Sequence, residues 1–115
     1  MERLYLQGNS LTKVPNFVLP KLRVLNLSNN KLTEVPTFHF PNLILLDLSR
    51  NNLTKIPPFD LPNLQSLQLN NNQLTEIPEF NLPNLQYFVS YDNQLTEVTK
   101  KKVKEKYGDK VNIFM

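Results

Sequence analysis

The sequence predicts an α/β solenoid, a coil in which each turn contributes one strand. Three observations predict this fold class: a 21-residue unit occurs five times, nearly every unit has two leucines separated by one residue, and the pattern ends near residue 98 in a stretch typical of a helix. Self-similarity at a period of about 20 to 50 residues is the signature of repeat architectures. We therefore divide the chain into five repeats, residues 1–98, and a C-terminal cap, residues 99–115.

The strand of each repeat is predicted from leucines that alternate with variable residues. In Leu46-Asp47-Leu48 the two leucines have a period of two, so both point to one face of a short strand. The first of these positions recurs as Leu4, Leu25, Leu46, Leu67 and Phe88. A second column contains only asparagine: Asn9, Asn30, Asn51, Asn72 and Asn93. Agreement of many columns at one period indicates a single repeated structural unit.

The second half of the unit supplies further apolar columns and two proline columns. Valine or isoleucine recurs at Val14, Val35, Ile56, Ile77 and Val98. The proline columns enclose a phenylalanine column at Phe17, Phe38, Phe59 and Phe80. Proline removes a backbone donor and pushes the preceding residue toward extended geometry. We therefore expect these return segments to be extended or single-turn 3₁₀ structure, without regular helices.

Written as a consensus, the unit is L-x-x-L-x-L-x-x-N-x-L-T-x-(V/I)-P-x-F-x-x-P-x. Its first half resembles the leucine-rich-repeat family, which has the same leucine spacing and an asparagine after the strand. The resemblance covers residues 1 to about 98. It implies a right-handed solenoid with a concave parallel β-sheet, and a continuous ladder formed by the asparagines. Together with the prolines, it predicts an irregular proline-rich convex side.

The apolar columns are expected to stack along the solenoid axis and to fill its core. Removing one member, as in Leu48→Ala or Phe59→Ala, should cost about 2–5 kcal/mol. A buried amide in the asparagine column can satisfy backbone groups of its own turn and of the next one. Asparagine also favours turns in general, but that preference does not explain five copies in register. Asn51→Ala should then cost about 1–3 kcal/mol.

The proline and phenylalanine columns end after residue 98. Residues 99–108 indicate a short amphipathic helix, which Gly108 is placed to end. One face of this helix carries Thr99, Val103 and Tyr107. Residues 111–114 alternate like one more strand. We expect this C-terminal helical cap, a short helix plus an edge strand, to cover the core that the last repeat leaves open.

No equivalent cap is evident at the start of the sequence, where Met1 already occupies a leucine position of the first repeat. An unpaired strand edge and its apolar neighbours would then face solvent. Three explanations stay open: a naturally uncapped protein, a fragment of a longer array, or a homodimer in which a second copy covers the N-terminal edge. The side chains concerned are Leu4, Leu6, Leu11, Val14, Phe17 and Leu19.

The composition argues against an enzyme. There is no cysteine and one histidine, His39, in a variable position, so neither a metal-ligand set nor a nucleophile with its base is indicated. The two glycines, Gly8 and Gly108, form no phosphate-binding loop. We predict no catalytic residues, no metal site and no cofactor. The lack of cysteine and of a signal-like N-terminal run favours a cytoplasmic protein, and no apolar stretch is long enough to span a membrane.

The net charge of +3 comes from the C-terminal end of the chain. From residue 97 onward there are six lysines and three acidic residues, whereas the first 96 residues hold seven of each sign. The lysine-rich cap could bind an anionic partner, and we keep this electrostatic binder as an alternative. A capping helix, however, needs a solvated outer face in any case. Aromatic residues that could stack on bases are limited to Tyr107 in this region, so nucleic acid is not the expected partner.

The variable strand positions form outward columns on the concave sheet, and they predict a binding function, because exposed tyrosines are favoured interface anchors. We predict a non-enzymatic module that binds a protein or peptide partner through Tyr5, Val24, Leu45, Asp47, Gln68, Tyr87, Val89 and Tyr91. Asp47 and Arg50 could add polar specificity, although scattered surface charges usually contribute little. Two alternatives stay open. The tyrosines of the fifth repeat could pack under the cap, or the chain could be a structural, self-assembling repeat protein.

Overall fold

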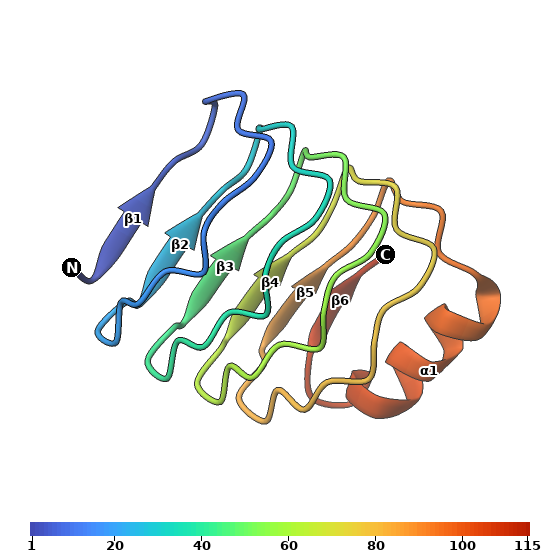
Figure 1. Ribbon diagram of the computed structural model, residues 1–115. Coiled ribbons are helices and arrows are strands. Elements are labelled where there is room, and N and C mark those ends of the chain that lie inside the picture. The colour runs from blue at the N-terminus through green and yellow to red at the C-terminus, as the bar shows by residue number, and fades with distance from the viewer.

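The computed structural model describes all 115 residues and shows one parallel sheet along one side of a solenoid, with irregular return segments on the other (Figure 1). The sheet has six strands in chain order, and the single helix packs at the C-terminal end. The elements are β1 (Arg3–Tyr5), β2 (Val24–Asn26), β3 (Leu45–Asp47), β4 (Ser66–Gln68), β5 (Tyr87–Val89), α1 (Glu97–Tyr107) and β6 (Asn112–Phe114). The predicted α/β solenoid with a parallel sheet is confirmed. Its one helix is too short and too polar to cross a membrane.

Strands β1 to β5 pair with a uniform step of 21 residues, so each column of the sequence becomes a row across the sheet. Leu25 pairs with Leu46, for example, and Val24 pairs with Leu45. The middle residue of each strand points into the core, and its two neighbours point outward. Strand β6 departs from this step: Phe88 pairs with Ile113, which is 113 − 88 = 25 residues further, because α1 replaces the usual return segment.

The apolar columns form one continuous core of 24 buried residues. The leucines at the strand centres are fully buried, and the phenylalanine rings stack along the convex side. Ring centroids lie 6.1 Å apart between Phe38 and Phe59, and 6.4 Å apart between Phe59 and Phe80. In the first repeat the equivalent side chains, such as Leu4 and Phe17, are only half-buried, because β1 forms an edge of the sheet.

The asparagine column forms a ladder of hydrogen bonds between successive turns. The side-chain oxygen of Asn51 accepts from the backbone N–H of Leu32 at 3.0 Å. Its Nδ2 donates to the carbonyls of Leu27, Leu48 and Ser49 at 3.0, 3.1 and 3.2 Å. Asn30, Asn72 and Asn93 repeat this pattern. The side chain of Asn9, in the edge repeat, bonds only to carbonyls of its own turn. The ladder therefore ties each strand end to the preceding repeat.

The convex side contains no helix between the strands, as the prolines predict. A second asparagine series, which the sequence analysis did not identify, braces it. The Nδ2 atoms of Asn42, Asn63 and Asn84 donate to the carbonyls of Pro20, Pro41 and Pro62 at 3.1, 2.7 and 2.9 Å. Each proline thus lies in the repeat before the asparagine that binds it. Proline removes a donor from the backbone, and this side-chain donor joins the adjacent turns instead.

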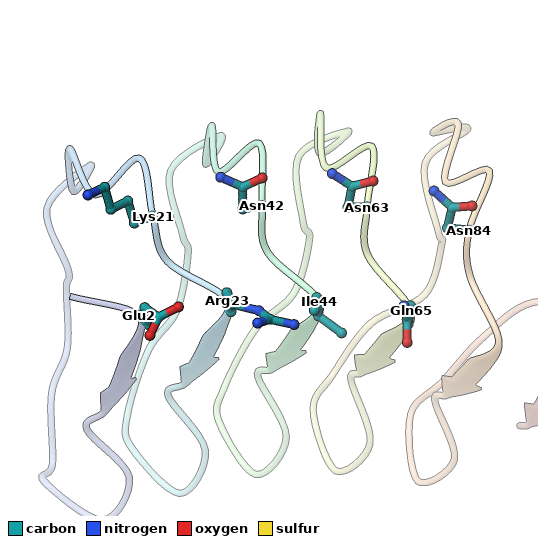
Figure 2. Close-up of a pocket in the computed structure, with 8 residues that line it drawn as sticks. All are labelled: Glu2, Lys21, Arg23, Asn42, Ile44, Asn63, Gln65 and Asn84. Atoms are coloured by element: carbon teal, nitrogen blue, oxygen red, sulfur yellow. The ribbon is translucent and has the colours of Figure 1, made fainter.

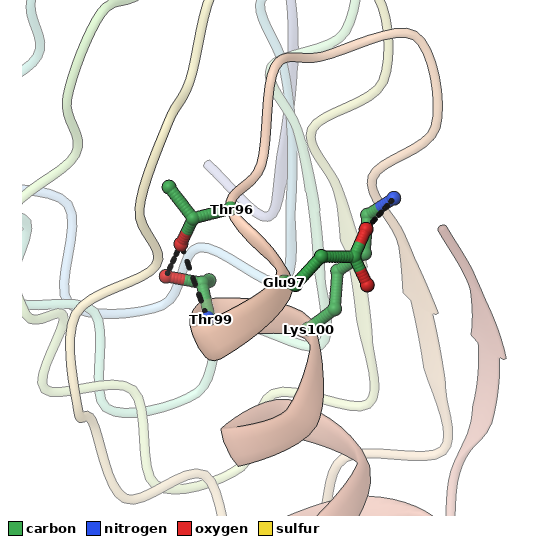
Figure 3. A network of polar contacts seen from close by, with 4 residues as sticks. All are labelled: Thr96, Glu97, Thr99 and Lys100. Atoms are coloured by element: carbon green, nitrogen blue, oxygen red, sulfur yellow. Dashed lines mark hydrogen bonds and ion pairs between the residues drawn. The ribbon is translucent and has the colours of Figure 1, made fainter.

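Helix α1 begins at Glu97, two residues earlier than predicted, because Thr96 caps it (Figure 3). The Thr96 hydroxyl accepts from the backbone N–H of Thr99 at 3.2 Å, which satisfies one of the free donors of the first turn. The predicted inner face is present: Thr99 and Val103 are buried, and Tyr107 packs against the core. The last residue of the helix is Tyr107. Gly108 follows as its C-cap with a φ of −57°, so left-handed geometry is not used there. A side chain at that position would instead collide with the Lys104 carbonyl oxygen.

Val98 corrects one assignment of the sequence analysis. We placed it in the core column with Val14, Val35, Ile56 and Ile77, but its side chain is 65% exposed. In the earlier repeats this residue precedes a proline in an extended segment. In the fifth repeat it lies in the first turn of α1, whose inward face starts at Thr99. The change from extended chain to helix therefore turns Val98 outward.

Candidate binding surface on the concave sheet

The outward positions of the strands form the concave face. Seven of the eight residues selected from the sequence flank the centre of a strand, and Tyr91 lies just after β5. Tyr5, Tyr87 and Tyr91 are 54%, 49% and 43% exposed. The other five are half-buried between their neighbours: Val24, Leu45, Asp47, Gln68 and Val89. The two tyrosines of the fifth repeat therefore do not pack under the cap.

The C-terminal end of this face carries most of its exposed apolar surface. Tyr87 and Val89 flank the centre of β5, and Tyr91 continues the alternation beyond the buried Ser90. Strand β6 adds a fourth member, because Val89 pairs with Phe114, and paired residues of a parallel sheet point to the same side. Phe114 is 53% exposed. We call these four residues, Tyr87, Val89, Tyr91 and Phe114, the aromatic patch.

The sequence analysis missed Phe114. The alternation of residues 111–114 was a sufficient signal for a strand, with Ile113 facing inward and Phe114 outward. The sequence did not indicate which strand pairs with these residues, since the 25-residue step from β5 to β6 lies outside the 21-residue pattern. The aromatic patch therefore becomes visible only when the cap is placed against the sheet.

The outward residues of β2 and β3 form an apolar row, Val24 and Leu45, and a polar row, Asn26 and Asp47, whose side chains bond within their own turns. The Asp47 carboxylate accepts from the backbone N–H and from the hydroxyl of Ser49, at 2.9 and 2.6 Å. Asn26 makes the same pair of contacts with Ser28, at 3.0 and 2.7 Å. Arg50 forms no ion pair with Asp47. Asp47 and Arg50, which the sequence suggested for polar specificity, therefore do not interact with each other.

A separate groove runs along the edge where the strands begin (Figure 2). It has a volume of about 480 Å³ and a single apolar lining residue, Ile44. Two rows of side chains border it: Lys21, Asn42, Asn63 and Asn84 on one side, and Glu2, Arg23, Ile44 and Gln65 on the other. The amides of its first row already bond to the prolines of the convex side. The groove lies outside the set of residues that we selected from sequence.

The lysine-rich cap presents a mixed surface. Lys100 lies 3.8 Å from Glu97 across one turn of α1 (Figure 3), and the Lys106 Nζ donates to the Phe80 carbonyl at 2.9 Å. The remaining lysines are exposed: Lys101, Lys102, Lys104 and Lys110. Two of them have an acidic neighbour in the sequence, since Glu105 follows Lys104 and Asp109 precedes Lys110. Two of the six lysines thus stabilise the cap itself, which weakens the case for an anion-binding surface.

The ionisable groups give no indication of catalytic chemistry. Tyr107 donates its hydroxyl to the Phe80 carbonyl at 2.7 Å, and burial raises the pKa of this tyrosine above its usual value of 10.0. The hydroxyl therefore stays protonated at neutral pH and acts as a structural donor. His39 is exposed on the convex side. No group of histidine, aspartate or glutamate side chains is arranged to hold a metal ion.

Comparison with known families agrees with this architecture. A family model described as leucine-rich repeats (two copies) matches residues 1–38, 41–80 and 62–101. These matches omit only residues 39 and 40 of the first 101, and the chain belongs to the leucine-rich-repeat family. Proteins of this family commonly bind other proteins and are generally not enzymes. No curated protein matches the chain.

Proposed function

We propose that this chain is a non-enzymatic module that binds a protein or peptide on its concave sheet, with the aromatic patch as the anchor. The observation that carries the proposal is the exposure of three aromatic rings at one end of this face: Tyr87 on β5, Tyr91 just after β5, and Phe114 on the adjacent β6. Large amphipathic rings lose little conformational entropy when they bind, and such residues dominate the energy of measured interfaces. A monomeric fold gains nothing from exposing them together.

The rest of the concave face suits a small partner. Six strands at a spacing of about 4.8 Å make a strip roughly 24 Å long. An extended chain advances about 3.3 Å per residue, so the strip accommodates about seven residues of a peptide or a loop. Hydroxyl and amide side chains, such as Ser66 and Gln68, lie beside the patch on β4. An apolar anchor beside polar neighbours is the usual anatomy of a binding interface.

The experiment uses the full chain and a displayed library of random 12-residue peptides as the probe. Selected peptides are synthesised, and their affinity is measured by fluorescence anisotropy. The Tyr87→Ala/Tyr91→Ala double variant should lose at least about tenfold in affinity, equivalent to roughly 1.4 kcal/mol. Tyr5→Ala is the matched control, because Tyr5 is an equally exposed tyrosine at the other end of the same face. It should change the affinity by less than about twofold.

Thermal unfolding checks that the variants stay folded, which their exposed positions favour. A selection that enriches no peptide would reject the proposal, and so would peptides that bind the double variant as tightly as the parent chain. If Tyr5→Ala and the double variant lose the same affinity, the binding site is not centred on the aromatic patch.

A second candidate, self-association, is supported by the apolar surface of the first repeat. Val18 is 90% exposed and Met1 is 67% exposed, and the core side chains beside them are only half-buried. Light scattering over a range of concentrations tests this candidate. A mass that rises with concentration in the parent chain and stays monomeric in Val18→Glu would support it. A constant monomer mass in the parent chain would reject it.

A further inference from the structure

The turn after each of the strands β1 to β5 contains a residue in left-handed geometry, and the first turn contains a second one, Ser10, with a φ of 58°. The column is Gly8, Asn29, Arg50, Asn71 and Asp92, with φ values of 71°, 56°, 55°, 60° and 54°. Glycine has no side chain to clash in this region, and asparagine and aspartate tolerate it better than other residues do. Four of the five members therefore suit the turn. Arg50 is the exception, since its long side chain gives it no such tolerance.

Nothing within the chain explains why an arginine occupies this position. The Arg50 backbone N–H donates to Asn70 at 2.9 Å, as the repeat requires, but its guanidinium makes no hydrogen bond or ion pair and the residue is exposed. Asn71 in the next turn is different, because its Nδ2 donates to the Asp92 carboxylate at 3.3 Å. A strained residue without a local compensating contact points to a functional role.

Arg50 is close to the aromatic patch. Its backbone bonds to the turn at Asn70, and the N–H of Asn71 in that turn bonds to the carbonyl of Tyr91 at 3.0 Å. Arg50 and Tyr91 are thus two strand spacings apart, which is about 10 Å. The two charged residues of this column have opposite signs. Arg50 is positive, and Asp92, directly beside Tyr91, is negative.

We infer that Arg50 binds a carboxylate of the peptide held on the aromatic patch, an inference that rests on the proposed function. The peptide carries an aspartate or glutamate three residues from the apolar side chain that packs on Tyr91. About 10 Å corresponds to one polyproline turn of ~9.3 Å, in which residues three positions apart point to the same side. A guanidinium binds a carboxylate through two parallel hydrogen bonds. Asp92 repels an acidic group at the patch end, which sets the direction of the peptide.

The library selection gives the first test. Enriched peptides should carry an acidic residue three positions from an aromatic or aliphatic one. The second test pairs the strongest such peptide with its amide counterpart, in which glutamate is replaced by glutamine. Arg50→Gln should lower the affinity for the acidic peptide by about tenfold or more and change the affinity for the amide peptide by less than about twofold. Arg23→Gln is the matched control, because Arg23 is an exposed arginine at the opposite edge of the sheet.

Arg50→Asn separates recognition from folding. It should bind like Arg50→Gln while its thermal midpoint rises, because asparagine tolerates the left-handed turn. Equal effects of Arg50→Gln on the acidic and amide peptides would overturn the inference and leave the aromatic patch intact as the site. Loss of dependence on Tyr87 and Tyr91 would overturn the proposed function, and this inference with it.

Discussion

The fourth and fifth repeats begin alike and end differently. Both have a strand, a ladder asparagine, a leucine and a threonine, up to Thr75 in one and Thr96 in the other. Three residues later the fourth repeat has Pro78, and the fifth has Thr99. Thr96 caps α1 by accepting the backbone N–H of Thr99, and a proline has no such donor. This contrast predicts that the residue at this position selects between an extended return segment and a helix.

The consequences of this difference reach the binding face. An extended return preserves the 21-residue step, whereas the helix lengthens the step to β6 and brings Phe114 beside Val89. The helical end also has a less regular core. Ser90 occupies a leucine column, is 1% exposed, and its hydroxyl has no hydrogen-bond partner. The regular repeats are built for stability, and the irregular end supplies most of the exposed rings.

The largest expected effect lies in the regular repeats. Phe59 is 3% exposed and lies between two other rings of its column, stacked on Phe38 and tilted against Phe80. Phe59→Ala should lower the free energy of unfolding by about 3–5 kcal/mol, because it leaves a cavity in a closely packed core. Denaturant unfolding measures this loss. Phe114→Ala makes the same substitution at an exposed ring and should cost less than about 1 kcal/mol. Similar losses at both sites would contradict the division between core and binding surface.

The asparagine ladder gives the next largest effect. Asn51 bonds to its own turn and to two groups of the preceding repeat. Asn51→Ala should therefore cost about 1–3 kcal/mol, since buried backbone groups lose their partners. Asn9→Ala should cost no more than about 1 kcal/mol, because the Asn9 side chain is exposed and donates only within its own turn. Unfolding curves of the two variants test this order directly, and a larger loss at Asn9 would reject it.

Giving the fifth repeat the proline of the fourth should prevent its helix from starting at Glu97. Thr99→Pro removes the donor that Thr96 accepts and disfavours helical geometry at Val98. It should reduce the helical circular dichroism signal and cost about 1–2 kcal/mol. Glu97→Pro is the control, because proline is well accepted at the first position of a helix and Thr96 is already extended. An unchanged helical signal in Thr99→Pro would show that the cap does not depend on this position.

The regular repeats could be predicted from the sequence, whereas the helical end could be predicted only in part. The strands and their register follow from the 21-residue step, because identical columns can stack in only one alignment. Val98 was misplaced because its column assignment assumed an extended return, although the missing proline at Thr99 was the signal of a change. Phe114 required the position of the cap. Asn42, Asn63 and Asn84 form a visible column, but their bonds to the preceding prolines depend on how adjacent turns are offset.

The smallest expected effect is a gain in stability. The turns after β2 and β3 have the same left-handed geometry, with Asn29 in one and Arg50 in the other. Arg50→Asn should raise the free energy of unfolding by about 0.5–1 kcal/mol, because asparagine tolerates this region better. The reverse change, Asn29→Arg, should lower it by a similar amount, since neither side chain hydrogen-bonds within the chain. Thermal unfolding of the two variants measures both shifts. If Arg50→Asn is destabilising, the arginine contributes to the fold itself, and the strain argument for its binding role fails.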